Sequence, residues 1–233
     1  DFVKVPTKKL VSDAYLKNRM KDYDAGKAGS SKLTKAGIIK ESEETTHLSV
    51  VDAMGNAVAV TTTLNGGYGS RAVVTGAGFI LNNEMDDFSV KPGVPNMYGA
   101  VGGEANSIAP NKRMLSSMTT TIVLKNGKPF IIVGTPGGTT IPTSVYQSIV
   151  NAIDFKLSPN FVINAPKFHH QWLPEVIYTE KNFPQHTIKV LEQKNYKFEN
   201  RNVIGRTEMI ILDENGNAIA VADGRGDDSV AVE

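Results

Sequence analysis

The chain has 233 residues, of which 40% are hydrophobic and 21 are glycine, an ordinary globular composition that can bury a sizeable core. Lysine and arginine number 25 against 24 aspartates and glutamates, so no net field favours binding to nucleic acid or to an anionic membrane surface. Cysteine is absent, which excludes disulfides, thiolate metal sites and a cysteine nucleophile, and no apolar run approaches the roughly 20 residues of a membrane span.

The first 44 residues differ in composition and in hydrophobic patterning from the rest of the chain. Ser12 can cap a short helix over residues 13–23, and the following "AGKAGSSKLTKAGIIKESEE" is small, polar and aperiodic. We therefore interpret residues 1–44 as a tail or linker and residues 45–233 as the main folded part. The chain opens with neither an initiator methionine nor an apolar signal core, so we expect a piece of a longer precursor.

Three hairpins are predicted from alternating strands around tight turns. The first joins "THLSVV" to "AVAVTTTL" through "DAMGN", and the second, in "TTTIVLKNGKPFIIVG", turns at Asn126-Gly127. The third, "MIILDENGNAIAVAD", repeats the local pattern D-x-x-G-N-A-x-A-V of the first. The spacing between them is irregular, which indicates a recurring supersecondary unit rather than a solenoid.

Helices are predicted between the hairpins. Residues 142–155 place Val145, Ile149 and Ile153 on one face, residues 184–195 form a shorter and more polar helix, and "SPNFVINAP" has a good helix opening in Ser-Pro. Strand hairpins at both ends with helices between them predict an α+β sandwich in which helices cover antiparallel sheet.

The pair Thr45-Thr46 opens a strand directly after the polar linker, and it has two interpretations. β-branched threonine is favoured at strand edges, which is a purely structural explanation. Alternatively the chain is cut before Thr45, which would make its hydroxyl a nucleophile and its new α-amine, with a reference pKa of roughly 8, the adjacent general base.

Seven motifs spread along the chain favour the second interpretation. They are "TTHLSVVD", "GNAVAVT", "LNNEMDDFSVKPGVPN", "YGAVGGEAN", "NKRMLSSM", "VGTPGG" and "APKFHHQWLPE". In this order they resemble the small subunit of the gamma-glutamyltransferases, and "DFVKVPTKKLVSDAY" resembles the last part of that family's large subunit. The resemblance implies an N-terminal-nucleophile hydrolase with an αββα core, of which residues 45–233 are the small-subunit half.

The resemblance also implies roles for the threonines. Thr45 matches the family's self-processing point and catalytic nucleophile, and Thr63 matches a threonine whose hydroxyl is hydrogen-bonded to that nucleophile. Asn65 matches a residue that binds the α-amino or α-carboxylate region of the substrate. Thr61 and Thr62 are interpreted as sheet-surface residues.

Acidic and hydroxyl residues match the rest of the substrate site. Glu84 and Asp87 match positions that hold the α-ammonium of the glutamyl group, whereas the residues by themselves favour a solvated acidic turn. Ser116 and Ser117 match hydroxyls that bind the α-carboxylate, together with an arginine of the large subunit that lies outside this chain.

Two glycines and one tyrosine complete the implied site. The amides of Gly137 and Gly138 match the oxyanion hole, because glycine permits positive φ and close approach, whereas Pro-Gly-Gly alone is often just a turn. Tyr98 lies in a Gly/Pro-rich stretch and matches the gating aromatic of the family's lid.

The implied activity is cleavage of γ-glutamyl amides such as glutathione through a γ-glutamyl-enzyme, with water or an amino acid as acceptor. This mechanism requires no metal and no organic cofactor, and the adjacent pair His169-His170 is interpreted as structural because the two side chains point apart and no third ligand is evident. The large subunit of the same precursor is the expected partner, and a periplasmic or secreted location is implied. Two alternatives stay open: an inactive structural or binding half, and a relative acting on polyglutamate or β-lactam side chains.

Overall fold

The structure is a computed structural model of the chain, and it describes residues 4–31, 45–96, 102–172 and 174–232. Among these residues no helix is long and apolar enough to cross a membrane. The helices are α1 Thr7–Leu10, α2 Asp13–Arg19, α3 Thr140–Ile153, α4 Pro159–Asn164 and α5 Gln185–Glu192, with short 3-10 turns η2 Glu84–Asp87 and η3 Glu104–Asn106. The strands are β1 Thr45–Val51, β2 Ala57–Thr63, β3 Val73–Val74, β4 Phe79–Ile80, β5 Thr121–Lys125, β6 Lys128–Gly134, β7 Phe168–His169, β8 Ile177–Thr179, β9 Phe198–Asn200, β10 Glu208–Leu212 and β11 Ala218–Val221.

All three predicted hairpins are present. Strand β1 pairs with β2, β5 with β6 and β10 with β11, each antiparallel. In the first and third hairpins the aspartate at the turn accepts hydrogen bonds from the asparagine four residues later, Asp52 from Asn56 and Asp213 from Asn217. The repeated sequence pattern therefore encodes the same turn twice.

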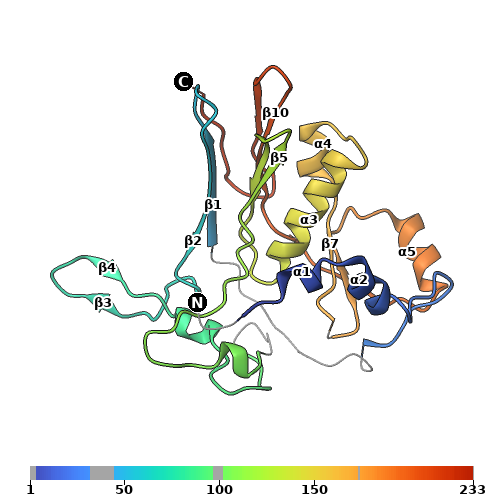
Figure 1. The fold of residues 1–233 in the computed structure, drawn as a ribbon, viewed down its shortest axis with the longest axis horizontal. Coiled ribbons are helices and arrows are strands. Elements are labelled where there is room, and N and C mark those ends of the chain that lie inside the picture. The colour runs from blue at the N-terminus through green and yellow to red at the C-terminus, as the bar shows by residue number, and fades with distance from the viewer. Residues whose placement is uncertain (1–3, 32–44, 97–101, 173, 233) are drawn as a thin grey trace.

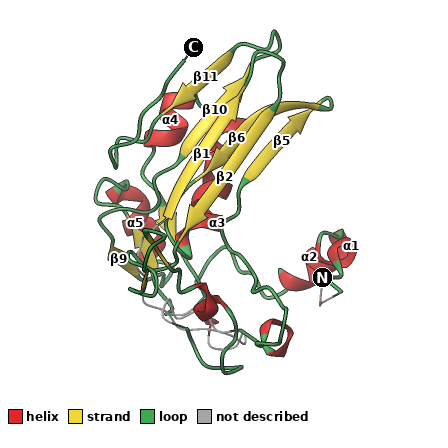
Figure 2. Ribbon diagram, turned by 90° about the vertical axis from the view of Figure 1, so that its left-hand side faces the viewer, coloured by secondary structure: helices red, strands yellow, loops and turns green. Residues whose placement is uncertain are grey.

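The strands and helices form layers, which Figure 1 shows edge-on. One layer is the β1–β2 hairpin, the next is a four-stranded sheet in the order β11-β10-β6-β5, and α3 and α4 cover the far face of that sheet. In Figure 2, β1 and β2 lie over the strands of the larger sheet and run roughly along them. This arrangement confirms the predicted α+β class, with helices over antiparallel sheet.

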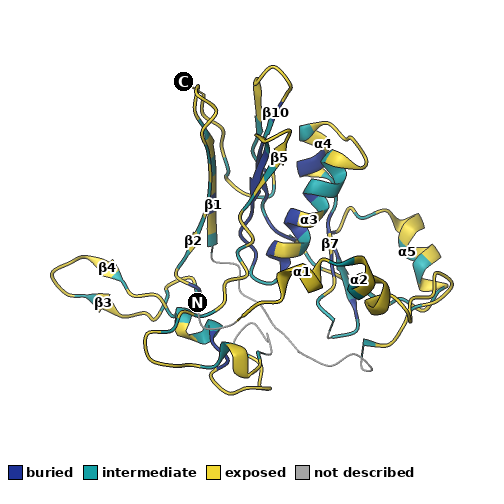
Figure 3. Ribbon diagram, in the orientation of Figure 1, coloured by how far each residue is buried: buried dark blue, intermediate teal, exposed yellow. Residues whose placement is uncertain are grey.

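Two apolar clusters join the layers, because successive side chains of a strand point to opposite faces. On β6, Ile131 and Val133 pack against the helices, where Val145 of α3 belongs to the same cluster. Ile132, between them in sequence, packs with Ile210 toward β1 and β2. Figure 3 shows this buried band along the middle of the molecule.

The outer face of the β1–β2 hairpin is apolar and exposed. Leu48 and Val50 of β1 are 58% and 44% exposed, and Val58 and Val60 of β2 are 50% and 44% exposed. The inner face of the same two strands carries the half-buried and buried positions. The inner face of the hairpin therefore packs against the larger sheet, whereas its apolar outer face is left exposed by the described residues.

The N-terminal part of the described chain lies against the body of the protein. The carbonyl of Ser31 accepts a hydrogen bond of 2.7 Å from the indole nitrogen of Trp172, and Glu175 accepts one from the Ser31 amide. Lys194 donates its ammonium to the carbonyl of Ala25 at 2.7 Å. The end of the predicted linker segment, residues 32–44, lies outside the described residues.

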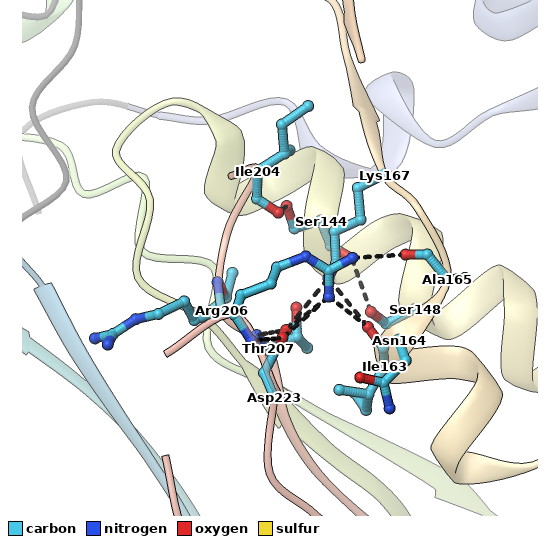
Figure 4. Close-up of polar contacts among 12 residues, drawn as sticks. Ser144, Ser148, Ile163, Asn164, Ala165, Lys167, Ile204, Arg206, Thr207 and Asp223 are labelled. Carbon is cyan, nitrogen blue, oxygen red and sulfur yellow. Dashed lines mark hydrogen bonds and ion pairs between the residues drawn. The ribbon is translucent and has the colours of Figure 1, made fainter. Parts of the chain in front are cut away.

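A buried network of charges joins the C-terminal segment to the helical layer. Arg225 contacts Glu180 at 2.6 Å and Asp223 at 3.0 Å, and it donates to the carbonyls of Ile163 and Ala165, both at 2.9 Å. Lys167 lies 3.4 Å from Asp223. Figure 4 shows part of this network, with Lys167, Asp223 and the carbonyl groups of Ile163 and Ala165 labelled.

The charges in this network compensate one another. Burial alone would raise the pKa of the Asp223 carboxyl, but Lys167 and the Thr207 amide hold that pKa below its ordinary value. Burial would likewise raise the pKa of Glu180, but Arg225 and the amides of Lys167 and Ile204 together hold that pKa below its ordinary value. Removing one cation would therefore leave buried carboxylates without their partner.

Replacing Arg225 with alanine should lower the free energy of unfolding by about 3–5 kcal/mol, because an uncompensated charge stays buried. Chemical denaturation of the variant measures this loss. The control is Lys125→Ala, which removes an exposed pair with Glu214 at 3.1 Å and should cost less than about 1 kcal/mol. Equal losses in the two variants would contradict the structural role of the buried network.

Candidate active site

The register of the first hairpin places the two predicted catalytic threonines opposite each other. Thr45, the first residue of β1, pairs with Thr63, the last residue of β2. The Thr45 hydroxyl donates to the Thr63 hydroxyl oxygen over 3.3 Å, and the Asn65 amide donates to the same oxygen over 2.9 Å. Thr63 thus orients the Thr45 side chain from the facing strand.

A pocket opens at this end of the hairpin. Six of the predicted site residues line it, together with Asn96, Met118, Thr139 and Ile141; the six are Thr45, Thr63, Asn65, Asp87, Ser117 and Gly138. Glu84, Ser116 and Gly137 are not among the lining residues, and each lies within three residues of one that is. Tyr98 lies outside the described residues, so its predicted role as a gate stays a prediction.

Asn65 connects the threonines to the acidic turn. It is buried and has φ of 73°, a left-handed conformation that asparagine adopts more readily than most residues. Its side-chain amide donates to the carbonyl of Asn83 at 3.2 Å, and the side chain of Asn83 accepts from the Gly66 amide at 2.8 Å. The turn that begins at Glu84 is therefore fixed next to Thr63.

The acidic turn holds two interacting carboxyl groups. Burial, and then the neighbouring Asp87, raise the pKa of Glu84 to about 7. Burial also raises the pKa of Asp87, while its hydrogen bond with Glu84 acts in the opposite direction. Below about pH 7 the two carboxyls therefore share one proton, and a cation beside them would favour its release.

Asn106 links the acidic turn to the serine motif. Its side-chain amide donates to the carbonyl of Asp87 at 2.7 Å, and its side-chain oxygen accepts from the Leu115 amide at 2.9 Å. Ser116 and Ser117 follow directly and are exposed. Asn106 thus links the predicted anion-binding residues, Ser116 and Ser117, to the acidic turn that carries the predicted cation-binding carboxylates.

The loop after β6 supplies the glycine pair. Gly137 and Gly138 have φ of 138° and 56°, conformations that favour glycine. A methyl group on Gly137 would lie 2.4 Å from the Thr140 hydroxyl, which itself donates to the Gly137 carbonyl at 2.7 Å. The loop is held in one shape by the first turn of α3.

Sequence reasoning missed the polar side chains on the inner face of the hairpin. His47 is buried and its ring contacts the hydroxyls of Thr61 at 2.7 Å and Ser49 at 3.0 Å. The prediction that Thr61 is a sheet-surface residue is therefore wrong, because strand alternation puts it on the same inner face as Thr63. That alternation is the signal that could have found both His47 and Thr61.

The histidine pair at 169–170 does not form a metal site with other described residues. Both ring nitrogens of His169 are engaged, by the Thr143 hydroxyl at 2.8 Å and by Gln171 at 2.7 Å. Within the described ranges no group of three or more histidine, aspartate or glutamate side chains could hold a metal ion.

Comparison with known proteins identifies the family. A model of the family described as gamma-glutamyltranspeptidase matches residues 1–233. The chain belongs to the gamma-glutamyltranspeptidase family. Among the proteins of this family, the glutathione hydrolase proenzyme of Escherichia coli (strain K12) is 48% identical over 232 residues, which are 99% of this chain and 40% of that protein. The glutathione hydrolase proenzyme of Pseudomonas aeruginosa is 49% identical over 185 residues, 79% of this chain and 33% of that protein.

Solved structures give the same family and its fold. A mutant of Helicobacter pylori gamma-glutamyltranspeptidase is 49% identical with a TM-score of 0.74, over 78% of this chain and 100% of that chain. Cephalosporin acylase from Bacillus halodurans is 25% identical with a TM-score of 0.80, over 98% of this chain and 40% of that chain. These likenesses confirm the predicted N-terminal-nucleophile hydrolase fold. The chain spans between a third and two fifths of the length of the two proenzymes it matches.

Replacing Gly137 with alanine should destabilise the protein more than the same change at an unconstrained glycine. The matched control is Gly76→Ala in the β3–β4 turn, where φ is also positive, at 82°, but no atom lies near the new methyl group. We expect the control to lower the free energy of unfolding by about 1–2 kcal/mol. Gly137→Ala should lower it by roughly twice that or more, because the strain of the loop is added. The free energy of unfolding of each variant measures the difference, and equal values would contradict a tightly held loop.

Proposed function

We propose that this chain carries the nucleophile of a precursor that cuts itself before Thr45 and then, with the rest of the protein, cleaves γ-glutamyl amide bonds. The observation that carries the proposal is the pocket in which the paired hydroxyls of Thr45 and Thr63 meet Asp87, Ser117 and Gly138. The names of the relatives, glutathione hydrolase proenzyme and gamma-glutamyltranspeptidase, support the same reaction and a precursor form.

In this proposal each part of the pocket has one chemical task. The Thr45 hydroxyl attacks the γ-carbonyl carbon of the substrate, and its proton passes to the α-amine that the cut exposes. The amides of Gly137 and Gly138 stabilise the oxyanion, and the α-amine passes the proton on to the leaving amine as the C–N bond breaks. Water or an amino acid then attacks the γ-glutamyl ester and restores the Thr45 hydroxyl.

The substrate's zwitterionic end is assigned to the residues around the acidic turn. Asp87 and Glu84 provide negative charge for the α-ammonium, and Asn65 lies beside them. Ser116 and Ser117 offer hydroxyl donors to the α-carboxylate. A carbon that carries both an ammonium and a carboxylate is thus matched by carboxylates and neutral donors on two linked segments.

We also propose that residues 1–44 become the end of a large subunit and residues 45–233 a separate small subunit. The match with the Helicobacter pylori structure supports this division, since the whole of that chain corresponds to only 78% of this one. The large subunit is then the permanent partner. A periplasmic or secreted location stays a prediction, which fractionation of producing cells would test.

The full-length precursor should produce two chains by a cut between residues 44 and 45, and Thr45→Ala should abolish this cut. Thr45→Ser should retain part of it, because the hydroxyl survives while the methyl group that restricts its rotamer is lost. Intact mass spectrometry of the purified proteins identifies the new terminus. Fragments of the same mass from the alanine variant would show that another group makes the cut.

Affinity for γ-glutamyl substrates should rise with pH through the titration of Glu84, whose pKa is about 7 in the empty site. Below that pH the pair holds a proton that the substrate's ammonium must displace, so the KM should fall as the pH increases. Glu84→Gln should remove this step from a pH series of KM.

The matched control is a glutaryl amide, which has the same length but no α-ammonium. Its KM should show no step near neutral pH with the unmodified enzyme. An identical pH dependence for the glutaryl and γ-glutamyl compounds would mean that the Glu84–Asp87 pair does not contact the ammonium.

A further inference from the structure

A buried histidine lies between the predicted nucleophile and the predicted oxyanion loop. His47 is two residues after Thr45 on β1, and its side chain is on the inner face of the hairpin, 5% exposed. On the facing sheet its ring rests on Gly134, the last residue of β6. A methyl group on Gly134 would lie 2.1 Å from Cε1 of this ring.

The ring is held in a single orientation. The Thr61 hydroxyl lies 2.7 Å from its Nδ1 and the Ser49 hydroxyl 3.0 Å from its Nε2, so both nitrogens are engaged. Burial lowers the pKa of His47 to about 4, which leaves the imidazole neutral at physiological pH. Because its ring is neutral and both nitrogens have hydroxyl partners, His47 places no net charge between the two sheets.

The contact with Gly134 reaches the oxyanion loop through a short rigid stretch. Thr135 is fully buried, and its hydroxyl donates to the Pro136 carbonyl at 2.7 Å and accepts from the Arg206 amide at 2.8 Å. Gly137 follows directly and is packed close to Gly205. A shift of the β6 end relative to β1 is therefore passed on to Gly137 and Gly138.

We propose that His47 is a positioning residue that sets the distance between the Thr45 hydroxyl and the amides of Gly137 and Gly138. The inference rests on the proposed function, since it concerns the same attack and the same oxyanion. The imidazole acts as a spacer of fixed width: its two nitrogens are held by hydroxyls of β1 and β2, and Cε1, which lies between them, fits the notch that Gly134 leaves.

A space-filling role in the core is the alternative explanation. It predicts that any change at this position lowers stability and that activity follows the folded fraction. A spacer predicts a different result, because a small displacement of nucleophile and oxyanion donors slows the chemical step without weakening substrate binding. The kcat and KM of the folded, mature enzyme separate the two explanations.

The first experiment compares Thr61→Val with Thr62→Val in the full-length precursor. Both changes replace a hydroxyl by a methyl group on adjacent residues of β2, but Thr61 contacts His47 whereas Thr62 is exposed on the opposite face. Thr61→Val should lower kcat roughly tenfold with little change in KM, as expected when one anchoring hydrogen bond is lost. Thr62→Val should leave both constants and the rate of the cut unchanged.

The second experiment is a double-variant cycle between Gly134→Ala and His47→Ala. Gly134→Ala alone forces the ring and the loop apart and should lower kcat by about a hundredfold. In the double variant the new methyl group enters the space that the ring has left, so kcat should recover at least about tenfold relative to Gly134→Ala alone. The rate of the cut before Thr45 should follow the same order.

Losses in kcat that simply add, or equal effects of Thr61→Val and Thr62→Val, would overturn the proposal. So would variants whose kcat stays at the unmodified value while only the unfolding temperature falls, since that is the behaviour of a core-filling residue. An unmodified precursor that cuts itself but does not turn over γ-glutamyl amides would contradict the proposed function instead. The rates of the cut in the same variants would then decide the role of His47.

Discussion

The antiparallel pairing of β1 with β2 is the constraint on which the candidate site depends. Seven consecutive residue pairs keep the two strands in register, so the first residue of one and the last residue of the other must meet. A slip of one residue would turn Thr45 and Thr63 to opposite faces and carry His47 out of the interior. The turn at Asp52 and Asn56 prevents that slip, because its hydrogen bonds fix the number of residues in the loop.

The second sheet gives this hairpin a rigid support. Strand β6 is central in its sheet, and its alternating side chains pack against helices on one side and against β1 and β2 on the other. The loop that carries Gly137 leaves the end of this strand and enters α3. The site is thus assembled in part from the ends of regular elements, whereas Asn65 and the acidic and serine segments come from the connection between β2 and β5, whose described residues form only short strands and 3-10 turns.

Local features of the sequence predicted the hairpins and the helices. Alternation over 45–63 and the Asn126-Gly127 turn act between neighbours in the chain, and they define strands and loops without further information. The same logic placed α3, although Ile153 is 41% exposed where the helix pattern put it on the buried face. The helix ends at this residue.

The assembly of the site could not be derived from local pattern. Asp87 and Ser117 meet Thr45 only through long loops held by Asn83 and Asn106, whose contacts span many residues of sequence. These positions were predicted from the resemblance to a family and not from spacing. Arg225 is a similar case, because its partner Glu180 lies 45 residues away and neither motif by itself indicates an ion pair.

The exposed face of β1 and β2 has a consequence for handling the protein. Four aliphatic side chains, Leu48, Val50, Val58 and Val60, lie on the exposed face of a two-stranded ribbon that pairs with no third strand among the described residues. Such a surface is a template for intermolecular strand addition. A recombinant piece restricted to this part of the sequence should therefore collect in inclusion bodies.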